Sequence, residues 1–407
     1  MDADKRPSRP SDTRGVTRRI LWIQNKPNHY FVQMLDALNS RGDVEYMGVF
    51  LCPSPAEGSL YQVPAISPHI FLGNASQNAG PEGYKRIGAG ARDFIGATAF
   101  AAAIVGGYDS AFKRWVLRYC HRRGLPAVLL TDSNIRAERG RSLRKKLKRF
   151  AKHIFLHRII KNLSCVIPVN RTGVAYWRYY GCPSAKITRS TYFCAVDIPK
   201  ALAIKRDELF ARYQLDPNCK LIFTAARLVP AKALHLMVEA FSQSGLAEKG
   251  WVWAVAGTGP LRQELEKLAA ERSQHAGSIR FLGAVAPVDI PPLMAQSELF
   301  VLPSVYEPHG IVVTEAMAVG TPVVASNDCG AARDLVRKNE TGWLFVSGDS
   351  ADLLRVLLIA TADGGKQLRA MRQSCNGAFA RWNALRSPMR VIPKLCREWQ
   401  SRAGRGL

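Results

Sequence analysis

Short apolar runs of strand length alternate with segments of helix length along most of the chain, and this alternation occurs twice. In the first half the expected strands are Ile20–Gln24, Val44–Leu51, Ala101–Val105, Ala127–Leu130 and Cys165–Val169. In the second half they are Leu221–Thr224, Trp251–Ala256, Ile279–Leu282, Leu299–Leu302 and Pro322–Ala325. Strands that alternate with helices form parallel sheets with helices on both faces. The sequence therefore predicts an α/β chain with two doubly wound domains facing a central crevice.

The helix-length segments set the expected domain boundaries. In the first half they are Tyr30–Leu38, Ser110–Arg122 and Leu143–Ile160, and in the second half helices should start near Ala231, Pro260, Ile290 and Gly310. The stretch Val196–Asn218 has no strand pattern and marks the junction. We expect a disordered basic tail over 1–17, Rossmann-like domains over 18–195 and 196–365, and C-terminal helices over 366–407 that pack back on the first domain.

Positive charge is concentrated in one part of the chain. The 407 residues hold 57 Lys and Arg against 32 Asp and Glu, a formal net charge of +25. Residues 101–200 alone hold 21 Lys and Arg against 4 Asp and Glu, whereas residues 201–407 hold 25 against 19. A surplus of this kind indicates a polyanionic ligand or an anionic surface next to the first domain.

Cysteine spacing and hydropathy bear on the compartment. The nine cysteines are scattered without a C-x-x-C pair or a Cys/His cluster, so the sequence supports neither a disulfide framework nor a metal site. The polar N-terminus does not resemble a signal peptide, and the longest apolar run, Ile95–Val105, is too short to span a bilayer. We expect a cytoplasmic protein, soluble or peripheral at the inner face of the membrane.

A pair of cations follows the first strand of the second half. Arg227 and Lys232 leave the same turn between the strand end at Thr224 and the next helix. Two fixed cations beside a helix N-terminus can bind a diphosphate without a metal. The alternative is two solvated surface cations.

A second candidate lies between Glu307 and Pro322. Glu307 falls on the loop after strand Leu299–Leu302, and Glu315 falls about one turn into the next helix. The free amides of Gly310 to Val312 would face the crevice, where a helix N-terminus favours an anion. A carboxylate just inside that helix can accept hydrogen bonds from ribose hydroxyls. The alternative makes Glu315 an ordinary first-turn acid and Glu307 a solvated loop residue.

The spacing Glu307-x7-Glu315 and its surroundings resemble the retaining family 4 glycosyltransferases of the type-B (GT-B) fold. Further motifs agree with that family in order: Ala226-Arg227-Leu228 with Lys232, Gly257-Thr258-Gly259-Pro260, Phe281-Leu282-Gly283, Gly320-Thr321-Pro322 and Thr341-Gly342-Trp343. The resemblance is specific over about 196–347 and weak over 18–195. Ala226 and Ala233 depart from it, since each replaces a usual glycine.

The resemblance implies roles for individual residues. Arg227 and Lys232 would bind the donor diphosphate, Glu315 the ribose, and Glu307 with the amides of Gly310, Ile311 and Val312 the transferred sugar and phosphate. Glu307, Arg227 and Lys232 would be the catalytic residues. His309 occupies a donor-site slot that is often aromatic, which leaves a packing or a base-contact role open. The donor would be a UDP- or GDP-sugar, with no cofactor and no metal.

The acceptor side has weaker motifs. Lys26, Asn28 and His29 follow the first strand at the end that should face the crevice. Asp132 and Asn134 lie where many relatives carry a His-Asp pair, so they are the candidate substitutes for it.

The segment Leu143–Ile160 has two possible interpretations. Leu143, Leu147, Phe150, Ile154 and Phe155 form a stripe at helical spacing, and seven cations occupy most of the remaining positions. The segment is either a core-packed helix with a solvated basic face or a patch that rests on anionic lipid. Binding of nucleic acid ranks third, behind these two interpretations, because no recognised nucleic-acid-binding module accompanies the charge.

Together these features predict a hexosyl- or related glycosyltransferase that retains anomeric configuration. The second domain would bind the nucleotide-sugar. The first would bind a lipid-linked or anionic saccharide acceptor, as in surface polysaccharide or lipopolysaccharide synthesis. The alternatives are a transferase with a soluble acceptor and a non-catalytic nucleotide-sugar- or polyanion-binding protein.

Overall fold

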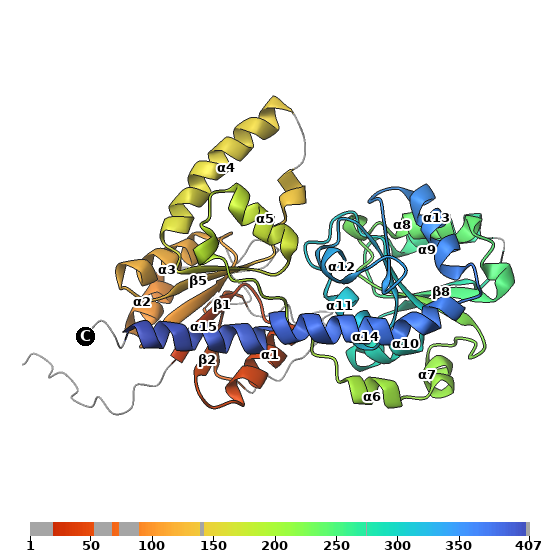
Figure 1. Cartoon of the computed structure of the whole chain (residues 1–407), viewed down its shortest axis with the longest axis horizontal. Coiled ribbons are helices and arrows are strands. Elements are labelled where there is room, and N and C mark those ends of the chain that lie inside the picture. The colour runs from red at the N-terminus through yellow and green to blue at the C-terminus, as the bar shows by residue number, and fades with distance from the viewer. Residues whose placement is uncertain (1–18, 53–66, 73–88, 139–141, 274, 404–407) are drawn as a thin grey trace, which may run out of the picture.

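The computed structural model describes residues 19–52, 67–72, 89–138, 142–273 and 275–403, and shows two parallel sheets, each covered by helices (Figure 1). The expected tail over 1–17 lies outside the described residues. The elements of the first domain are β1 (Arg19–Gln24), α1 (His29–Asn39), β2 (Glu45–Phe50), β3 (His69–Phe71), α2 (Ala89–Ala97), β4 (Ala102–Gly106), α3 (Ala111–Arg122), β5 (Ala127–Thr131), η2 (Ile135–Glu138), α4 (Leu143–Lys161), β6 (Cys165–Pro168), α5 (Arg171–Tyr179) and η3 (Ser184–Lys186).

The second domain and the C-terminal helices follow. Their elements are α6 (Ile198–Ala203), α7 (Arg206–Arg212), β7 (Lys220–Ala225), η4 (Pro230–Lys232), α8 (Leu234–Gln243), η5 (Ala247–Lys249), β8 (Trp251–Ala256), α9 (Arg262–Arg272), β9 (Ile279–Gly283), η6 (Pro287–Asp289), α10 (Ile290–Gln296), β10 (Leu299–Leu302), α11 (Ile311–Ala318), β11 (Val323–Ser326), α12 (Gly330–Leu335), β12 (Gly342–Phe345), α13 (Ser350–Thr361), α14 (Lys366–Arg386) and α15 (Pro388–Ala403).

Both sheets have the same strand order. The first reads β3-β2-β1-β4-β5-β6 and the second, from its other edge, β9-β8-β7-β10-β11-β12. The strand pairs within each sheet are parallel, and the strand order reverses between β1 and β4 and between β7 and β10. Ligands of such sheets bind at the carboxyl ends of the strands beside these switch points. The predicted pair of doubly wound domains is thus confirmed.

The predicted strands agree with the structure where they are buried. Trp251–Ala256 and Leu299–Leu302 match β8 and β10 in full, and the remaining expected strands overlap observed ones. Two strands were missed. β3 has three residues in a mostly exposed pattern, and β12 is the four-residue run Gly342–Phe345, which entered the sequence analysis only as part of a motif.

Two glycines let the loops at the top of the second sheet meet. A Cβ on Gly257 would lie 1.9 Å from the Ala226 carbonyl oxygen, and one on Gly259 would lie 2.4 Å from that of Leu228. The Gly-x-Gly turn after β8 therefore packs directly on the loop that carries Arg227. The motif Gly257-Thr258-Gly259-Pro260 is thus a tight turn between a strand and a helix.

The two C-terminal helices pack on different domains. Cys375 and Phe379 of α14 belong to the apolar core of the second domain, and Ile392 and Leu395 of α15 belong to that of the first. The Arg41 guanidinium also donates to the Met389 carbonyl at 2.9 Å. Figure 1 shows the two helices running along both domains, so they connect them.

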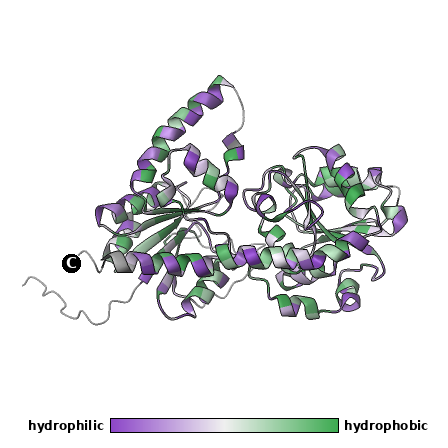
Figure 2. Cartoon of the chain, in the orientation of Figure 1, coloured by the Kyte–Doolittle hydropathy of each residue, from purple (hydrophilic) through white to green (hydrophobic). Residues whose placement is uncertain are grey.

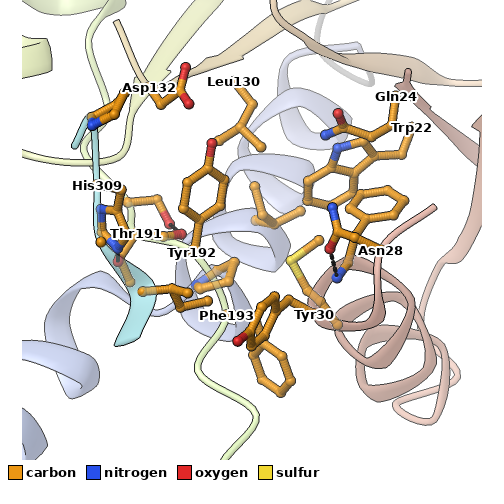
Figure 3. Close-up of a pocket in the computed structure, with 18 of the residues that line it drawn as sticks. Trp22, Gln24, Asn28, Tyr30, Leu130, Asp132, Thr191, Tyr192, Phe193 and His309 are labelled. Atoms are coloured by element: carbon orange, nitrogen blue, oxygen red, sulfur yellow. Dashed lines mark hydrogen bonds between the residues drawn. The ribbon is translucent and has the colours of Figure 1, made fainter. Parts of the chain in front are cut away.

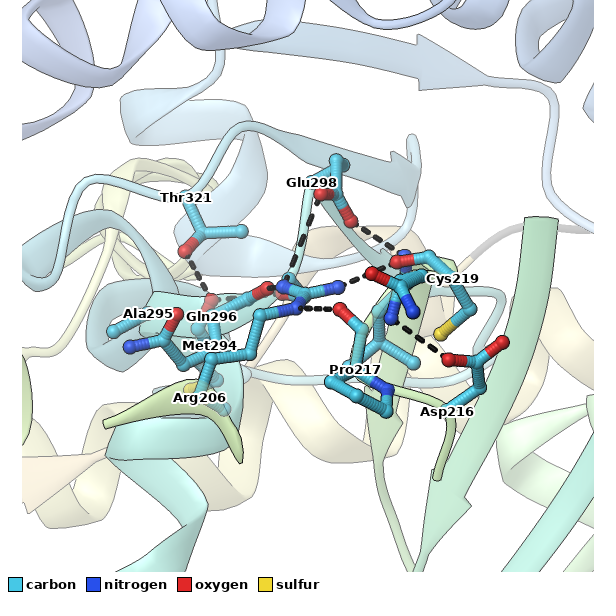
Figure 4. A network of polar contacts seen from close by, with 12 residues as sticks. Arg206, Asp216, Pro217, Cys219, Met294, Ala295, Gln296, Glu298 and Thr321 are labelled. Atoms are coloured by element: carbon cyan, nitrogen blue, oxygen red, sulfur yellow. Dashed lines mark hydrogen bonds and ion pairs between the residues drawn. The ribbon is translucent and has the colours of Figure 1, made fainter. Parts of the chain in front are cut away.

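A polar network lies at the amino end of β7, a central strand of the second sheet (Figure 4). Arg206 donates to the carbonyls of Pro217, Cys219 and Gln296, and its guanidinium lies 4.1 Å from the Phe210 ring centroid. Glu298 accepts from the Leu221 amide at 2.5 Å. The start of β7 is thereby held to α7 and α10.

Helix α4 is only half packed. Leu156, Ile159 and Ile160 are buried in the first domain, but the interpretation of the whole stripe as core-packed is wrong, because Leu143, Leu147, Phe150, Ile154 and Phe155 are exposed. A helix of 19 residues is about 28 Å long, whereas the five residues of β5 span about 17 Å. The N-terminal half therefore projects past the sheet (Figure 1).

Two further features concern the whole set of described residues. In that set, no helix has the length and apolar character needed to cross a bilayer. All nine cysteines are described, and each is a free thiol.

Candidate functional site

The loops after β7 and β10 bring together an ion pair. Lys232 ends η4, and its ammonium contacts the carboxylate of Glu307. The amides of Val305 and Tyr306 both donate to the Ala231 carbonyl, at 3.0 and 3.3 Å, which holds the two loops side by side. The sequence placed Lys232 and Glu307 in separate motifs, and the fold joins them at one edge of the crevice.

Lys232 is followed by a residue with an unusual backbone. Ala233 has φ 47° and ψ 42°, in the left-handed region where glycine is favoured. This conformation lets the chain turn directly from η4 into α8. It gives a physical reason for the glycine that the resembled family usually has at this position.

The N-terminus of α11 opens beside Glu307. Gly310 has φ +86°, and a Cβ there would lie 2.6 Å from the Cys329 sulfur and 3.0 Å from Glu307 Cγ. The helix begins at Ile311 without a side-chain cap, so its first amides are available to a ligand. An anion at this end gains from the helix dipole as well.

Glu315 lies one turn inside α11. The side chain is buried, and its Oε2 makes no hydrogen bond to the described residues. Burial raises the pKa of Glu315 to about 7, although the nearby Tyr30 hydroxyl of the first domain lowers it in part. A buried carboxylate with an unused acceptor atom suits a hydroxyl-bearing ligand.

Arg227 differs from Lys232 in its surroundings. It lies on the loop after β7, packed from behind by the Gly257–Gly259 turn, and its side chain is exposed. The structure thus places both cations at the carboxyl end of the sheet, with only Lys232 paired to Glu307.

His309 is a buried packing residue in this structure. Its ring lies 5.0 Å from that of Tyr192 and 6.5 Å from that of Trp382, centroid to centroid, and Nε2 lies 3.3 Å from the Thr191 hydroxyl. Burial, with the charge of Arg189, lowers the pKa of His309 to about 3. The ring is therefore neutral at physiological pH.

A pocket lies between the domains (Figure 3). Its volume of about 290 Å³ is near the lower end of the range for small-molecule sites. Side chains from β1, α1, the junction near 190–193, the loop before α11 and α15 line it. Those used in the argument below are Trp22, Gln24, Asn28, Tyr30, Asp132, Tyr192, Glu307, His309, Gly310 and Ile311. Neither Lys232 nor Glu315 is among the lining residues.

Of the candidate acceptor residues, Asp132 occupies the most central place. It lies at the carboxyl end of β5 and faces both this pocket and a neighbouring polar pocket of about 470 Å³. Its side chain is exposed to these pockets, yet the surrounding protein groups displace enough water to raise the pKa of its carboxyl, the Tyr192 hydroxyl lowers that pKa, and the charges of Glu307 and Asp109 raise it further. Asp132 is therefore the carboxylate of the first domain that faces the Glu307 loop.

The other acceptor candidates have different positions. Asn28 lines the pocket and caps α1 by accepting from the Phe31 amide at 2.9 Å. Asn134 is buried and accepts from the Arg136 amide at 2.9 Å, which makes it a turn residue. Lys26 is half-buried on the β1–α1 loop and does not line the pocket, and His29 opens α1 with its side chain outside the description.

Several pocket residues escaped the sequence analysis. Gln24 ends β1, Tyr30 lies on α1 and Tyr192 lies on the junction, so only the fold brings them together. Asp109 pairs with the buried ammonium of Lys113 at 2.8 Å in the polar pocket. None of them belongs to a motif. Two of them could have been found from their positions, because Gln24 ends an expected strand and Asp109 follows one.

Direct contacts hold the domains together around the site. Arg189 donates to the buried Asp334 at 2.8 Å, and the Asn170 amide donates to the Pro308 carbonyl at 2.5 Å. Arg136 of η2 also forms an ion pair with Asp328. The described ranges contain no group of three or more His, Cys, Asp or Glu that could hold a metal ion.

Comparison with known proteins agrees with this fold. Residues 205–375 match the model of the family described as Glycosyl transferases group 1. The solved structure of the Anabaena protein HepE in complex with UDP and glucose superposes with a TM-score of 0.68 at 19% identity, covering 94% of this chain and 100% of that one.

Sequence relatives cover the chain only in part. The alpha-D-kanosaminyltransferase of Streptomyces kanamyceticus is 28% identical over 206 residues, 50% of this chain and 53% of that protein. A GDP-mannose-dependent alpha-(1-6)-phosphatidylinositol monomannoside mannosyltransferase of Mycobacterium tuberculosis is 34% identical over 154 residues, 36% and 39% of the two chains. The chain thus spans about half or less of the length of these curated relatives.

The two domains with their crevice therefore define a type-B glycosyltransferase fold. Within it, residues 205–375, the segment that carries Lys232, Glu307 and Glu315, match the group 1 glycosyl transferases.

Proposed function

We propose that this protein is a nucleotide-sugar-dependent glycosyltransferase. The observation that carries the proposal is the convergence of Lys232, Glu307 and the uncapped α11 N-terminus at one edge of the crevice, with the unused Oε2 of Glu315 one turn behind. This set provides a cation and free amides for a diphosphate and a carboxylate for ribose hydroxyls. HepE, of the same fold, has been solved with UDP and glucose, which supports a UDP-sugar; the mannosyltransferase relative keeps a GDP-sugar open.

The reaction would join an acceptor oxygen to the anomeric carbon as the bond to the diphosphate breaks. Arg227, Lys232 and the α11 amides would stabilise the charge on the departing diphosphate, and no metal would be needed. We propose retention of configuration, with attack from the leaving-group face, from the resemblance to family 4. Contacts such as Asn170 to Pro308 close the domains over the site, which limits hydrolysis by water.

The acceptor would bind in the pocket between the domains, on the side of Asp132 and Tyr192. The surplus of positive charge in residues 101–200 favours a lipid-linked or otherwise anionic saccharide at the inner membrane face, as in surface polysaccharide or lipopolysaccharide synthesis. The mannosyltransferase relative is named for a phosphatidylinositol-linked acceptor, which supports this class. A soluble acceptor is the competing proposal.

A thermal-shift panel of UDP-, GDP- and ADP-sugars tests the donor site, because a ligand of the folded state raises its stability. We expect one nucleotide class to raise the midpoint of the wild-type protein. Lys232→Ala should reduce that shift, while His235→Ala, exposed on the next helix, should leave it unchanged. If no sugar nucleotide shifts the wild type, or if Lys232→Ala keeps full affinity, the donor-site assignment is wrong.

A further inference from the structure

The projecting half of α4 carries a row of apolar side chains directed away from the protein. Leu143, Leu147, Phe150 and Ile154 are 73%, 62%, 68% and 46% exposed. Their spacings of four, three and four residues put them on one line along the helix. Isolated exposed apolar residues are normal, but four in a continuous row mark an interaction surface.

This row is distinct from the face by which α4 packs on its own domain. Leu156, Ile159 and Ile160 are buried in the core of the first domain. At about 100° per residue, the mean directions of the two sets differ by roughly 160° around the axis. One helix thus has two apolar faces, of which the C-terminal one is used within the domain.

Polar contacts fix the rotation of α4. Lys152 forms an ion pair with Glu138, and its ammonium lies 4.9 Å from the Tyr176 ring centroid. Arg149 donates to the Glu138 carbonyl at 2.9 Å. Phe155 lies against Tyr108 at 6.2 Å, centroid to centroid, so it belongs to the domain side. The outward direction of the row is therefore built into the fold.

The charge of α4 identifies the partner. The helix holds eight Lys and Arg and no acid, and in Figure 2 hydrophobic and hydrophilic residues alternate along it. Exposed Arg144 and Lys146 flank the row on either side, and Arg118 and Arg122 are exposed on neighbouring α3. Nucleic acid would use the cations but leave four aliphatic and aromatic side chains in water. A cationic helix with an apolar row fits a surface that offers both anionic headgroups and hydrocarbon.

We propose that α4 docks this protein on an anionic lipid bilayer, with Leu143, Leu147, Phe150 and Ile154 inserted at the headgroup boundary and the flanking cations on the phosphates. The chain runs from Asp132 through η2 to the start of α4, so the inserted end lies on the crevice side of the sheet. Docking thus brings the crevice to the membrane surface. Its use in delivering a lipid-linked acceptor rests on the function proposed above, whereas the docking itself does not.

Vesicle co-sedimentation of the full chain tests the docking. We expect binding to phosphatidylcholine vesicles that contain about one third phosphatidylglycerol, and weak binding to phosphatidylcholine alone. Leu147→Glu with Phe150→Glu should weaken binding about tenfold or more, because two inserted side chains become charged. Val288→Glu is the matched control, since Val288 is 66% exposed on η6 of the second domain, and it should bind like the wild type.

A second readout tests insertion. The native cysteines are buried or half-buried, so Leu147→Cys accepts an environment-sensitive fluorophore selectively. We expect a blue shift of its emission with anionic vesicles and none with heparin. A wild type that ignores anionic vesicles, a double variant that binds them normally, or an equal loss in Val288→Glu would overturn the proposal. So would binding to heparin that matches binding to vesicles and is unaffected by the double variant, because that result indicates a polyanion site.

The two proposals fail separately. The double variant should keep the melting temperature and the sugar-nucleotide thermal shift of the wild type, since its residues are exposed and remote from α11. If the protein binds vesicles but no sugar nucleotide raises its melting temperature, the proposed function is wrong and the membrane docking by α4 still stands. If a sugar nucleotide raises the melting temperature but the protein does not bind vesicles, the membrane docking is wrong and the proposed function still stands.

Discussion

The two domains share one strand order and differ in where their distinctive residues lie. In the second domain they lie in loops at the carboxyl ends of β7 and β10, where Lys232, Glu307 and the start of α11 meet. In the first domain they lie in a pocket assembled from separate elements and on the outside of α4. The same scaffold thus carries a site built from local motifs in one half and a site built by tertiary packing in the other. We expect variants in the two halves to separate donor from acceptor and membrane functions.

The largest effect should follow loss of the cation at the donor site. Lys232→Ala should lower kcat for sugar transfer about 10²–10³-fold, because it removes stabilisation of the charge that develops on the leaving group. The measurement is nucleotide diphosphate release at saturating donor. His235 lies on the exposed face of α8 and serves as the control. If His235→Ala is as slow as Lys232→Ala, the loss does not come from the donor site.

The close loop contact in the second domain predicts a large loss of stability. Gly257→Ala should lower the free energy of unfolding by about 3 kcal/mol, because the new Cβ would overlap the Ala226 carbonyl. Gly250→Ala is the matched control: its φ is +76° but nothing lies within 4 Å, so about 1 kcal/mol of backbone strain is expected. Urea denaturation of both variants gives the difference, and equal losses would refute the role of the contact.

The raised pKa of Glu315 predicts that the stability of the protein depends on pH. Since its pKa is about 7 in the folded protein and about 4.3 in an unfolded chain, the folded state binds the proton more tightly. Stability from this group is present at low pH and is lost as pH rises from about 4.3 through 7. At about 1.4 kcal/mol per pKa unit, Glu315→Gln should therefore gain about 3 to 4 kcal/mol over the wild type at pH 8 and almost nothing at pH 4.

Denaturant midpoints across that pH range check this prediction. A pH-independent difference between Glu315→Gln and the wild type would contradict the assignment of the titration to Glu315. The same variant should bind the nucleotide more weakly, because an amide replaces one carboxylate acceptor of the ribose hydroxyls.

The smallest effect should be confined to the acceptor side. Asp132→Asn should lower kcat/KM for the acceptor about tenfold, the size expected for one charged hydrogen bond. Tyr192→Phe, which removes the neighbouring hydroxyl, should act in the same direction. Steady-state kinetics with the acceptor varied at fixed donor measures both variants. A change in donor KM of the same size would place Asp132 on the donor side and remove the distinction between the halves.

The fold was predictable because its signal is local. Buried strands such as β8 and β10 are continuous apolar runs, and the breaks at Gly257 and Gly310 mark turns that their backbone geometry requires. The placement of Glu307 on a loop and of Glu315 one turn inside the next helix was predictable for the same reason, since one short segment carries both. β3 was missed because three residues are too few to show the alternation of apolar and polar side chains that marks a strand.

The first-domain site could not be predicted in the same way. Asp132 was a candidate from the family resemblance, but Gln24 and Tyr192 belong to no motif and each lies more than fifty residues from it along the chain. Only the packed fold makes the three neighbours. For α4, the sequence predicted a single apolar stripe, whereas the helix has two apolar faces. Which face is buried depends on the length of the sheet beneath it, and that is a tertiary property.

The central claim is that the donor binds through the motif-bearing half alone. Isothermal titration of the matching sugar nucleotide into the wild type, Lys232→Ala and Asp132→Asn tests it directly. The account predicts a Kd at least about tenfold weaker for Lys232→Ala, the loss of one charged hydrogen bond, and an unchanged Kd for Asp132→Asn. Equal affinity of Lys232→Ala and the wild type, or an equal loss in both variants, would contradict it.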